Sequence, residues 1–345
     1  MPIAPPLPWL GIAVALLTTL LLLLSGLPLA RRMGWVDRPD ARKCHLAPTP
    51  LIGGVAMYGG YCLGGLWLAT PSIPLNILWI VATCTLLIGC LDDCRTLHPW
   101  GRFVTEFALA LLLTGWGGLT IHNLGDFTGL GVVILEASAV FWTMIFFVGI
   151  INAVNMSDGL DGVAGGQTLV SFLILFLLAI QAGRWQDAWW ILLAMAALLP
   201  FLLFNLPFTP HSQARVFMGD AGSKLLGFAL VWFSGALSHG EQPACSPAAA
   251  LWILAVPLLD MFSSVARRLH AGRHPFASDT GHIHHLLLRS GYNKQQVFFI
   301  LVATSALFAS LGAAAFLLAL PDALLFYTFL AVLAGYSWFV IRHPL

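Results

Sequence analysis

The sequence predicts an all-α polytopic membrane protein, and three observations lead to that fold class. First, 59% of the 345 residues are hydrophobic and only 9% are charged, whereas a soluble domain carries about 25% charged residues. Second, apolar runs of roughly 20 residues, the length that crosses a bilayer as a helix, follow one another along the chain. Third, the basic residues gather in every second loop between these runs. The net charge of +1 also argues against a nucleic-acid binder.

About eleven transmembrane helices are expected, with ends set by the limits of the apolar runs. The predicted spans are 7–30, 51–70, 75–91, 103–121, 130–151, 163–182, 188–206, 219–238, 247–266, 296–318 and 321–341. Two prolines within 70–74 predict a turn between the second and third spans. The first run is too long for the core of a signal peptide, so we expect a retained helix. Without an internal repeat or a linker, residues 1–345 are expected to form one domain.

The basic residues also predict the orientation of the chain, because they favour the cytoplasmic side of a membrane. If alternate loops lie inside, beginning after the first span, all of the 16 Lys and Arg residues except Arg184 fall inside. This places the N-terminus in the periplasm and the C-terminus in the cytoplasm, for a multi-pass protein of a bacterial inner membrane. The unusual polar motifs all fall on the cytoplasmic side. A transporter, the alternative from another functional class, would place such groups near the bilayer midplane.

The cysteines do not follow a metal-site pattern. They are Cys44, Cys62, Cys84, Cys90, Cys94 and Cys245, and most fall in apolar runs or beside basic loops. We expect reduced thiols that act as small apolar side chains.

The first polar motif is the pair Asp92 and Asp93, at the inner end of the third span. Adjacent carboxylates repel each other, which raises the pKa of one of them unless a cation lies between them. Such a pair suits divalent-metal binding or general-base catalysis. The alternative interpretation is that the pair is simply the solvated end of a helix. From the two aspartates alone, that interpretation is favoured over a metal-binding or catalytic role.

The second motif runs from Asn152 to Gly162 and places Asn155, Asp158 and Asp161 at every third position. On a helix these three would share a face. The Asp-Gly pairs, of which Gly159 is a member, instead favour a helix break where backbone approaches a ligand. Amides and carboxylates in this arrangement can bind a nucleobase and a ribose.

The third motif, residues 217–223, places Asp220 between glycines at the start of a span. A helix N-terminus attracts anions, and a carboxylate there can hold Mg²⁺ that also binds a diphosphate. A simple N-cap is the equal alternative.

The fourth motif is the cluster His282, His284 and His285, downstream of Arg267 and its basic neighbours. Histidines among arginines indicate phosphate recognition. A transition-metal site is the rival, and the nearby positive charge disfavours it.

One further acid, Asp260, lies inside an apolar run. An ionisable residue at such a position is a candidate functional residue, and an ion pair with an arginine is the equal alternative. Glu106 and Glu136 lie near the ends of spans, and the sequence assigns them no role.

Taken together, these motifs resemble the polyprenyl-phosphate N-acetylhexosamine-1-phosphate transferases, over most of the chain from Val36 to about Leu311. The shared elements are Val36-Asp37-Arg38-Pro39, Arg42-Lys43-Cys44-His45, Pro50-Leu51-Ile52-Gly53-Gly54, the two-acid motif, the Asn155 motif, the Asp220 motif and the histidine cluster. The stretch from Val256 through Asp260-Met261 and Arg267-Arg268 to His282-Ile283-His284-His285-Leu286 is similar to the WecA branch. Two further features are the His-Ile-His-His order and the absence of a lysine from Ala47-Pro48-Thr49-Pro50. Both features depart from the MraY branch, which disfavours a muramyl-pentapeptide substrate.

The resemblance implies that a sugar 1-phosphate, with GlcNAc as the first choice, passes from a UDP-N-acetylhexosamine to undecaprenyl phosphate and that UMP is released. It implies a Mg²⁺ cofactor, for which Mn²⁺ could substitute. Asp92 is then the candidate base or nucleophile with Asp93, while Asp220 and Asp93 hold the metal. Asn155, Asp158, Gly159 and Asp161 bind the nucleotide, and Lys43, His45, Arg267, His282, His284 and His285 bind phosphates or sugar.

Several points stay open at this level. Because much of a phosphate monoester is already a dianion at neutral pH, Asp92 could act by positioning rather than by removing a proton. The mechanism could have one step or a covalent intermediate, and FucNAc, QuiNAc or GalNAc could replace GlcNAc. A metal-dependent membrane hydrolase is a third functional class. The prenyl length, the polymer built downstream and the oligomeric state, for which a homodimer is one option, are not fixed by the sequence.

Overall fold

The structure is a computed structural model that describes residues 8–38, 47–68, 72–95, 97–209, 213–240, 242–275 and 281–342. The helices are α1 (Pro8–Met33), α2 (Gly53–Gly65), α3 (Ile73–Cys94), α4 (Pro99–Trp116), α5 (Ala139–Ser157), α6 (Val163–Gln181), α7 (Trp185–Asn205), α8 (Gly219–Ser238), α9 (Pro247–Ile253), α10 (Ala255–His270), α11 (Ile283–Arg289), α12 (Lys294–Leu317) and α13 (Asp322–Arg342). The strands β1 (Val36–Asp37) and β2 (Thr49–Pro50) form one short antiparallel pair. The predicted all-α polytopic class is confirmed.

Each predicted apolar run contains helix, but the helices differ in length and apolar content more than the runs do. Within the described residues, eight helices are long and apolar enough to cross a membrane, and the bent pair α9–α10 would make a ninth span. The other two runs hold α2, which has only 13 residues, and α4, which has 18. Arg102 and Glu106 lower the hydropathy of α4, and both prove to be part of a buried cluster of charges. The chain is a multi-pass membrane protein.

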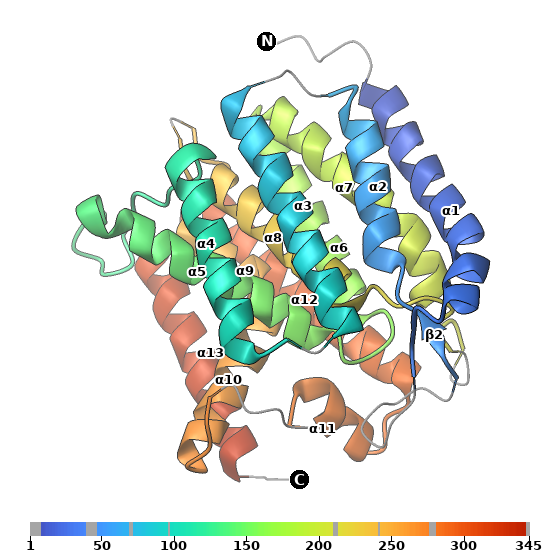
Figure 1. The fold of residues 1–345 in the computed structure, drawn as a ribbon. Coiled ribbons are helices and arrows are strands. Elements are labelled where there is room, and N and C mark those ends of the chain that lie inside the picture. The colour runs from blue at the N-terminus through green and yellow to red at the C-terminus, as the bar shows by residue number, and fades with distance from the viewer. Residues whose placement is uncertain are drawn as a thin grey trace.

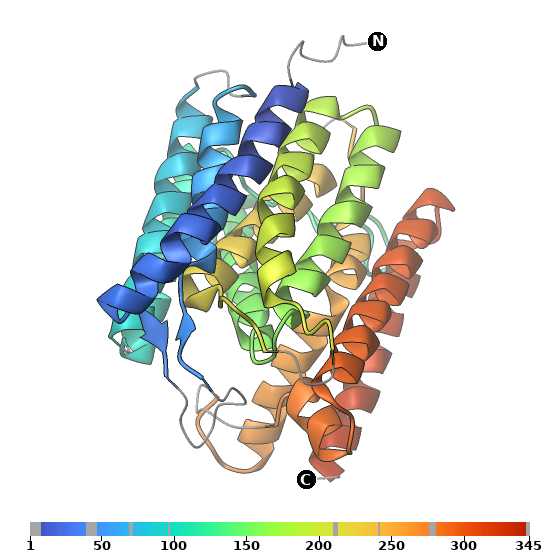
Figure 2. The same ribbon diagram turned by 90° about the vertical axis from the view of Figure 1, so that its right-hand side faces the viewer.

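The helices form a bundle with α8 near its centre (Figures 1 and 2). Helix α8 packs against α2, α3, α5 and α6, and 78% of its apolar window is buried, compared with 17% for α13 at the edge. α1 begins at the upper end of the bundle in Figure 1, and α13 finishes at the lower end. Large apolar side chains such as Leu21, Val104 and Phe141 are exposed on the outer helices, as expected for surfaces that face lipid.

The ninth predicted span, 247–266, is wrong as a single straight helix, because the chain bends by 83° between α9 and α10. Pro257 lacks the N–H that would bond to the carbonyl of Ile253 in a continuous helix. The hydroxyl of Ser171 on α6 donates to that carbonyl at 2.9 Å instead. The bend is therefore stabilised by a neighbouring helix, and it directs α10 toward the lower end of the bundle.

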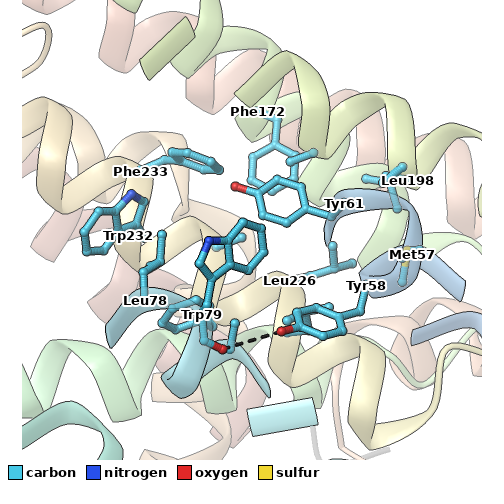
Figure 3. Close-up of a pocket in the computed structure, with 16 residues that line it drawn as sticks. Met57, Tyr58, Tyr61, Leu78, Trp79, Phe172, Leu198, Leu226, Trp232 and Phe233 are labelled. Carbon is cyan, nitrogen blue, oxygen red and sulfur yellow. Dashed lines mark hydrogen bonds between the residues drawn. The ribbon is translucent and has the colours of Figure 1, made fainter. Parts of the chain in front are cut away.

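An apolar cavity of about 50 Å³ lies among α2, α3, α6, α7 and α8 (Figure 3). Aromatic side chains, among them Tyr61, Trp79 and Phe233, form much of its wall, and it contains no ionisable acid or histidine. The hydroxyl of Tyr58 donates to the carbonyl of Trp79 at its edge. This cavity lies apart from the polar motifs. The five described cysteines are free thiols, as predicted, and Cys44 lies outside the described residues.

Candidate active site

The predicted polar motifs converge at the lower end of the bundle, where α3 and α5 finish and α8 begins (Figure 1). Helix α11, which carries two of the motif histidines, lies at the same end. Residues that are far apart in the sequence thus reach one region because alternate helices begin and end there. The one-sided arrangement that the sequence predicted is confirmed.

Asp93, which lies on α3, caps the N-terminus of α8. Its Oδ1 accepts the backbone N–H of Asp220 at 2.7 Å, and its Oδ2 accepts that of Ala221 at 3.3 Å. The first amides of a helix have no partner within it, so a carboxylate there is stabilised by hydrogen bonds and by the helix dipole. Gly219 has a φ of +68°, and a side chain at this position would overlap Asp93. The glycine before Asp220 is therefore required for this close approach.

Asp220 is oriented by α5 and does not cap its own helix. Asn155 Nδ2 donates to Asp220 Oδ1 at 2.7 Å and to Ser223 Oγ at 2.9 Å. The N-cap position belongs to Met218. The simple N-cap alternative for Asp220 is wrong, because Asp93 takes that role, and Asp220 remains available for a ligand. The predicted contact of Asn155 with a nucleobase stays a prediction, and its amide nitrogen already has two partners.

The second motif breaks the helix, as its Asp-Gly pairs indicated. α5 ends at Ser157, and residues 158–162 form a turn that ends with Gly162 at a φ of +80°. Burial, followed by repulsion from nearby carboxylates, raises the pKa of Asp158 well above its usual range. Those carboxylates are Asp220, Asp93 and Asp161. Asp158 therefore joins the acids at the end of α3 and the start of α8.

Asp161 points to a different part of the molecule. It is buried, and its Oδ2 lies 3.7 Å from Nζ of Lys294, at the start of α12. The backbone of the following residue, Gly162, donates to Asn205 Oδ1 at 2.7 Å. This half of the turn connects α5 and α6 to α7 and α12. The half that contains Asp158 faces Asp93 and Asp220, and we call these three acids the acidic cluster.

Asp92, the neighbour of Asp93, has different hydrogen-bond donors, and its carboxyl also interacts with that of Asp220. Its Oδ1 accepts the backbone N–H of Leu97 at 2.9 Å. Its Oδ2 lies 3.1 Å from Lys224 Nζ and 3.2 Å from Arg102 Nη1. Both oxygens of this buried carboxylate thus have strong donors, which favours a positioning role over proton removal.

Two further residues of the site, Lys224 and Glu106, were not predicted from the motifs. Lys224 is 2% exposed, and its Nζ lies 3.6 Å from Glu106 Oε1 as well as close to Asp92. Asn152 Nδ2 donates to Glu106 Oε2 at 2.6 Å. A lysine within a predicted span was the available signal, because ionisable groups at such positions are rarely incidental.

The fourth motif is built around Asp260. The carboxylate Oδ2 lies 2.8 Å from His282 Nδ1, and Oδ1 accepts the backbone N–H of Ile283 at 2.8 Å. The partner of this intramembrane acid is thus a histidine and the start of α11, not an arginine. A carboxylate at Nδ1 favours a proton on that nitrogen and leaves Nε2 as the acceptor, which faces Arg268 Nη2 at 3.5 Å.

His284 joins the histidine cluster to the second motif. It is 2% exposed, it stacks on His282 with an interplanar angle of 4°, and a side chain at Gly159 would overlap its ring. Burial first, and then the neighbouring His285, lowers the pKa of His284 to about 3. The ring is therefore neutral near pH 7. The glycine of the second motif is needed here for packing.

The remaining predicted phosphate ligands are placed unequally. Arg267 Nη1 donates to the carbonyl of Gly281 at 3.0 Å, which anchors the histidine segment to α10. Lys43 and His45 lie outside the described residues, between β1 and β2 in the sequence. The chain after β2 does reach the site, because Gly53 N donates to Phe217 O and Phe217 N donates to Pro50 O.

The donor set of the acidic cluster fits Mg²⁺. Asp93, Asp158 and Asp220 offer oxygen ligands, and burial, followed by repulsion among nearby carboxylates, raises the pKa of Asp158, an effect that a bound cation would oppose. Within the described residues, no group of three or more His, Cys, Asp and Glu side chains is placed so that it could hold a metal ion by itself. Mg²⁺ commonly uses one or two carboxylates and takes its other ligands from water and substrate phosphates.

Comparison with known proteins identifies the family. The model of glycosyl transferase family 4 matches residues 75–238. The undecaprenyl-phosphate alpha-N-acetylglucosaminyl 1-phosphate transferase of Escherichia coli (strain K12) is 36% identical over 302 residues, 87% of this chain and 82% of the relative. The protein of that name from Pasteurella multocida is 33% identical over 337 residues, 96% of this chain and 93% of the relative. The chain belongs to glycosyl transferase family 4.

The match to glycosyl transferase family 4 spans the acidic half of the site. Residues 75–238 include Asp92, Asp93, the Asn155 motif, Asp220 and Lys224. The histidine cluster lies beyond this range, within the longer similarity to the curated relatives. The resemblance drawn from the motifs is thereby confirmed, and the chain is a phosphosugar transferase by family.

Proposed function

We propose that this chain transfers an N-acetylhexosamine 1-phosphate, with GlcNAc as the first choice, from a UDP-sugar to undecaprenyl phosphate and releases UMP. The curated relatives are named for an N-acetylglucosaminyl 1-phosphate transfer to undecaprenyl phosphate. The observation that carries the proposal is the convergence of Asp93, Asp158 and Asp220 at one end of a membrane bundle. A lipid phosphate anchored at the bilayer surface and a water-soluble donor can meet only at such an end.

In the reaction, an oxygen of the lipid phosphate attacks the phosphorus that carries the sugar. The new P–O bond forms as the bond between the two phosphates of the donor breaks, and UMP leaves with that electron pair. Because the lipid phosphate is largely dianionic near pH 7, the attack needs little help from a base. The bonds from Lys224, Arg102 and Leu97 to Asp92 support a one-step transfer without a covalent aspartyl intermediate.

The residues divide into three tasks. Asp220, oriented by Asn155, would hold Mg²⁺ with Asp93, and the substrate phosphates and water would supply the other ligands. When bound, the metal offsets the charge of two anions that otherwise repel each other. The nucleotide would lie over the turn that contains Asp158 and Gly159. Arg267, the histidine cluster and the segment that holds Lys43 and His45 would surround the phosphates and the sugar.

We place this site on the cytoplasmic face of a bacterial inner membrane. The placement is supported by the distribution of basic residues, of which only Arg184 falls on the other side. In the structure Arg184 caps the far end of α8, where its Nη1 donates to the carbonyls of Ala236 and His239. Nucleotide-sugars occur in the cytoplasm, so the orientation and the chemistry agree.

The test is a reconstituted reaction. The purified protein in detergent is given Mg²⁺ and undecaprenyl phosphate, and UDP-GlcNAc, UDP-GalNAc, UDP-FucNAc and UDP-QuiNAc are offered separately. We expect UMP and a lipid-diphosphate-sugar, detected by mass, from UDP-GlcNAc. UMP without any lipid acceptor would indicate a hydrolase. No UMP from any donor, with a folded protein, would refute the transfer and return attention to a transporter.

A further inference from the structure

Two buried charges near the site have no task in the proposed reaction. Lys224 on α8 and Glu106 on α4 are 2% and 4% exposed. They form a four-residue group with Asp92 on α3 and Arg102 on α4, which we call the charge cluster. Lys224 Nζ lies 3.1 Å from Asp92 and 3.6 Å from Glu106, and Arg102 lies 3.2 Å from Asp92.

The charge cluster balances two acids against two bases. Burying ionic groups is costly unless they pair well, and removing one partner of a buried pair leaves an uncompensated charge. Asn152 completes the arrangement by donating to Glu106. Asn152 and Asn155 lie three residues apart on α5, so the helix that supports Glu106 also orients Asp220.

The cluster separates the two adjacent acids into different roles. Asp92 directs both oxygens to Leu97, Lys224 and Arg102. Asp93 directs its oxygens to the start of α8, beside Asp220. Lys224 and Arg102 therefore compensate the negative charge of Asp92, which also interacts with Asp220, whereas Asp93 bonds to backbone amides of α8.

We infer that Lys224 is a positioning residue that fixes Asp92 and, through its positive charge, limits how tightly the site binds a divalent cation at Asp220. Lys224 lies one helical turn after Asp220 on α8. Its positive charge opposes a cation bound at Asp220, and Glu106 partly offsets that charge. The inference rests on the proposed function because it requires a divalent metal at Asp220.

The decisive readout is metal binding without turnover. Mn²⁺ is titrated into the purified protein and free Mn²⁺ is followed by electron paramagnetic resonance. Lys224→Met removes a nearby positive charge and should tighten Mn²⁺ binding at least about fivefold. Glu106→Gln removes a negative charge and should weaken binding by about two- to fivefold. A purely structural role for both residues would change the affinity in one direction for both variants.

Turnover gives a second readout. Lys224→Met should lower kcat by about 10- to 100-fold, as expected when a group that orients a site residue is lost. The KM for the UDP-sugar should change by less than about threefold. Lys224→Arg keeps the charge and should keep the Mn²⁺ affinity. Adding Glu106→Gln to Lys224→Met restores the charge balance and should recover part of kcat.

Asp187→Asn is the matched control, because it breaks the ion pair with Arg184 at the opposite end of the bundle. It should change neither Mn²⁺ affinity nor kcat.

If the wild-type protein turns over without a divalent metal and does not bind Mn²⁺, the metal in the proposed function and this inference both fail. If the wild type needs the metal but Glu106→Gln does not weaken binding, or Lys224→Met does not tighten it, only this inference is overturned. Should Lys224→Met not fold, Glu106→Gln and Lys224→Arg decide the question.

Discussion

The two halves of the site satisfy their charges in different ways. In the acidic half, Asp93, Asp158 and Asp220 gather at helix ends, and burial, followed by repulsion from nearby carboxylates, raises the pKa of Asp158. In the histidine half, Asp260 is bonded to His282 and to the backbone of Ile283. The first half gathers several carboxylates, whereas the acid of the second is paired with a histidine and a backbone amide. The proposed function accordingly assigns the metal to the acidic half and the phosphates and sugar to the histidine half.

The largest effect is expected for Asp220→Asn. The amide keeps the size of the side chain and can still accept from Asn155, but it removes the charge that would hold the metal. We expect kcat for UMP release to fall by more than about 1,000-fold, because metal-ion catalysis stabilises charge by several kcal/mol. Ser223→Ala is the matched control, since it removes a neutral partner of Asn155. That control should cost less than about tenfold, and equal losses in both variants would contradict the assignment.

Asp260→Asn tests the histidine half. The asparagine would present a donor to His282 Nδ1 or lose the bond to Ile283, so the ring loses its fixed orientation. We expect kcat to fall by about 10- to 100-fold, the usual range for a group that orients a site histidine. Tyr336→Phe removes a weaker, 3.4 Å contact with the same carboxylate and should have little effect. Unchanged kcat in Asp260→Asn would remove His282 from the working site.

Gly159→Ala tests the contact that joins the two halves. A Cβ at this position would overlap the ring of His284, so the variant should lower the free energy of unfolding by about 1–3 kcal/mol. Gly149→Ala is the control, because Gly149 lies within α5 before the turn and an added Cβ there would meet nothing within 4 Å. It should leave stability unchanged or raise it by up to about 1 kcal/mol. Thermal unfolding in detergent compares the two, and equal behaviour would show that the halves are not in contact.

Much of the fold was predictable because the bilayer imposes a simple rule on sequence. Runs of apolar residues predicted the helices, and rare polar residues predicted which end carries the site. The bend at α9–α10 was missed because hydropathy does not report direction, although Pro257 was a visible signal. The short α2 was also missed, because the apolar run continues past the end of the helix at Gly65.

The charge cluster shows what a sequence cannot supply. Lys224 and Asp92 are 132 residues apart, and their pairing depends on how α3 and α8 pack. Asp260 was found as an unusual residue, but its partner His282 lies 22 residues away, at the start of α11. Individual residues were therefore identified by their rarity in an apolar chain, and their partners required the tertiary structure. The metal-binding role assigned to Asp220 is the prediction that Asp220→Asn addresses.

The smallest expected effect concerns pH. The pKa of His284 is lowered from 6.5 to about 3 in the folded protein, so the unfolded chain binds a proton more readily than the folded chain between these values. Stability from the neutral ring is present above pH 6.5 and is lost as pH falls toward 3. Between pH 7 and pH 6 the loss should be about 0.7 kcal/mol. Denaturant unfolding at both pH values should show this loss in the wild type and not in His284→Gln, whose side chain does not titrate. Equal pH dependence of the two proteins would mean that His284 is solvated, and the two halves of the site would then not be packed together through it.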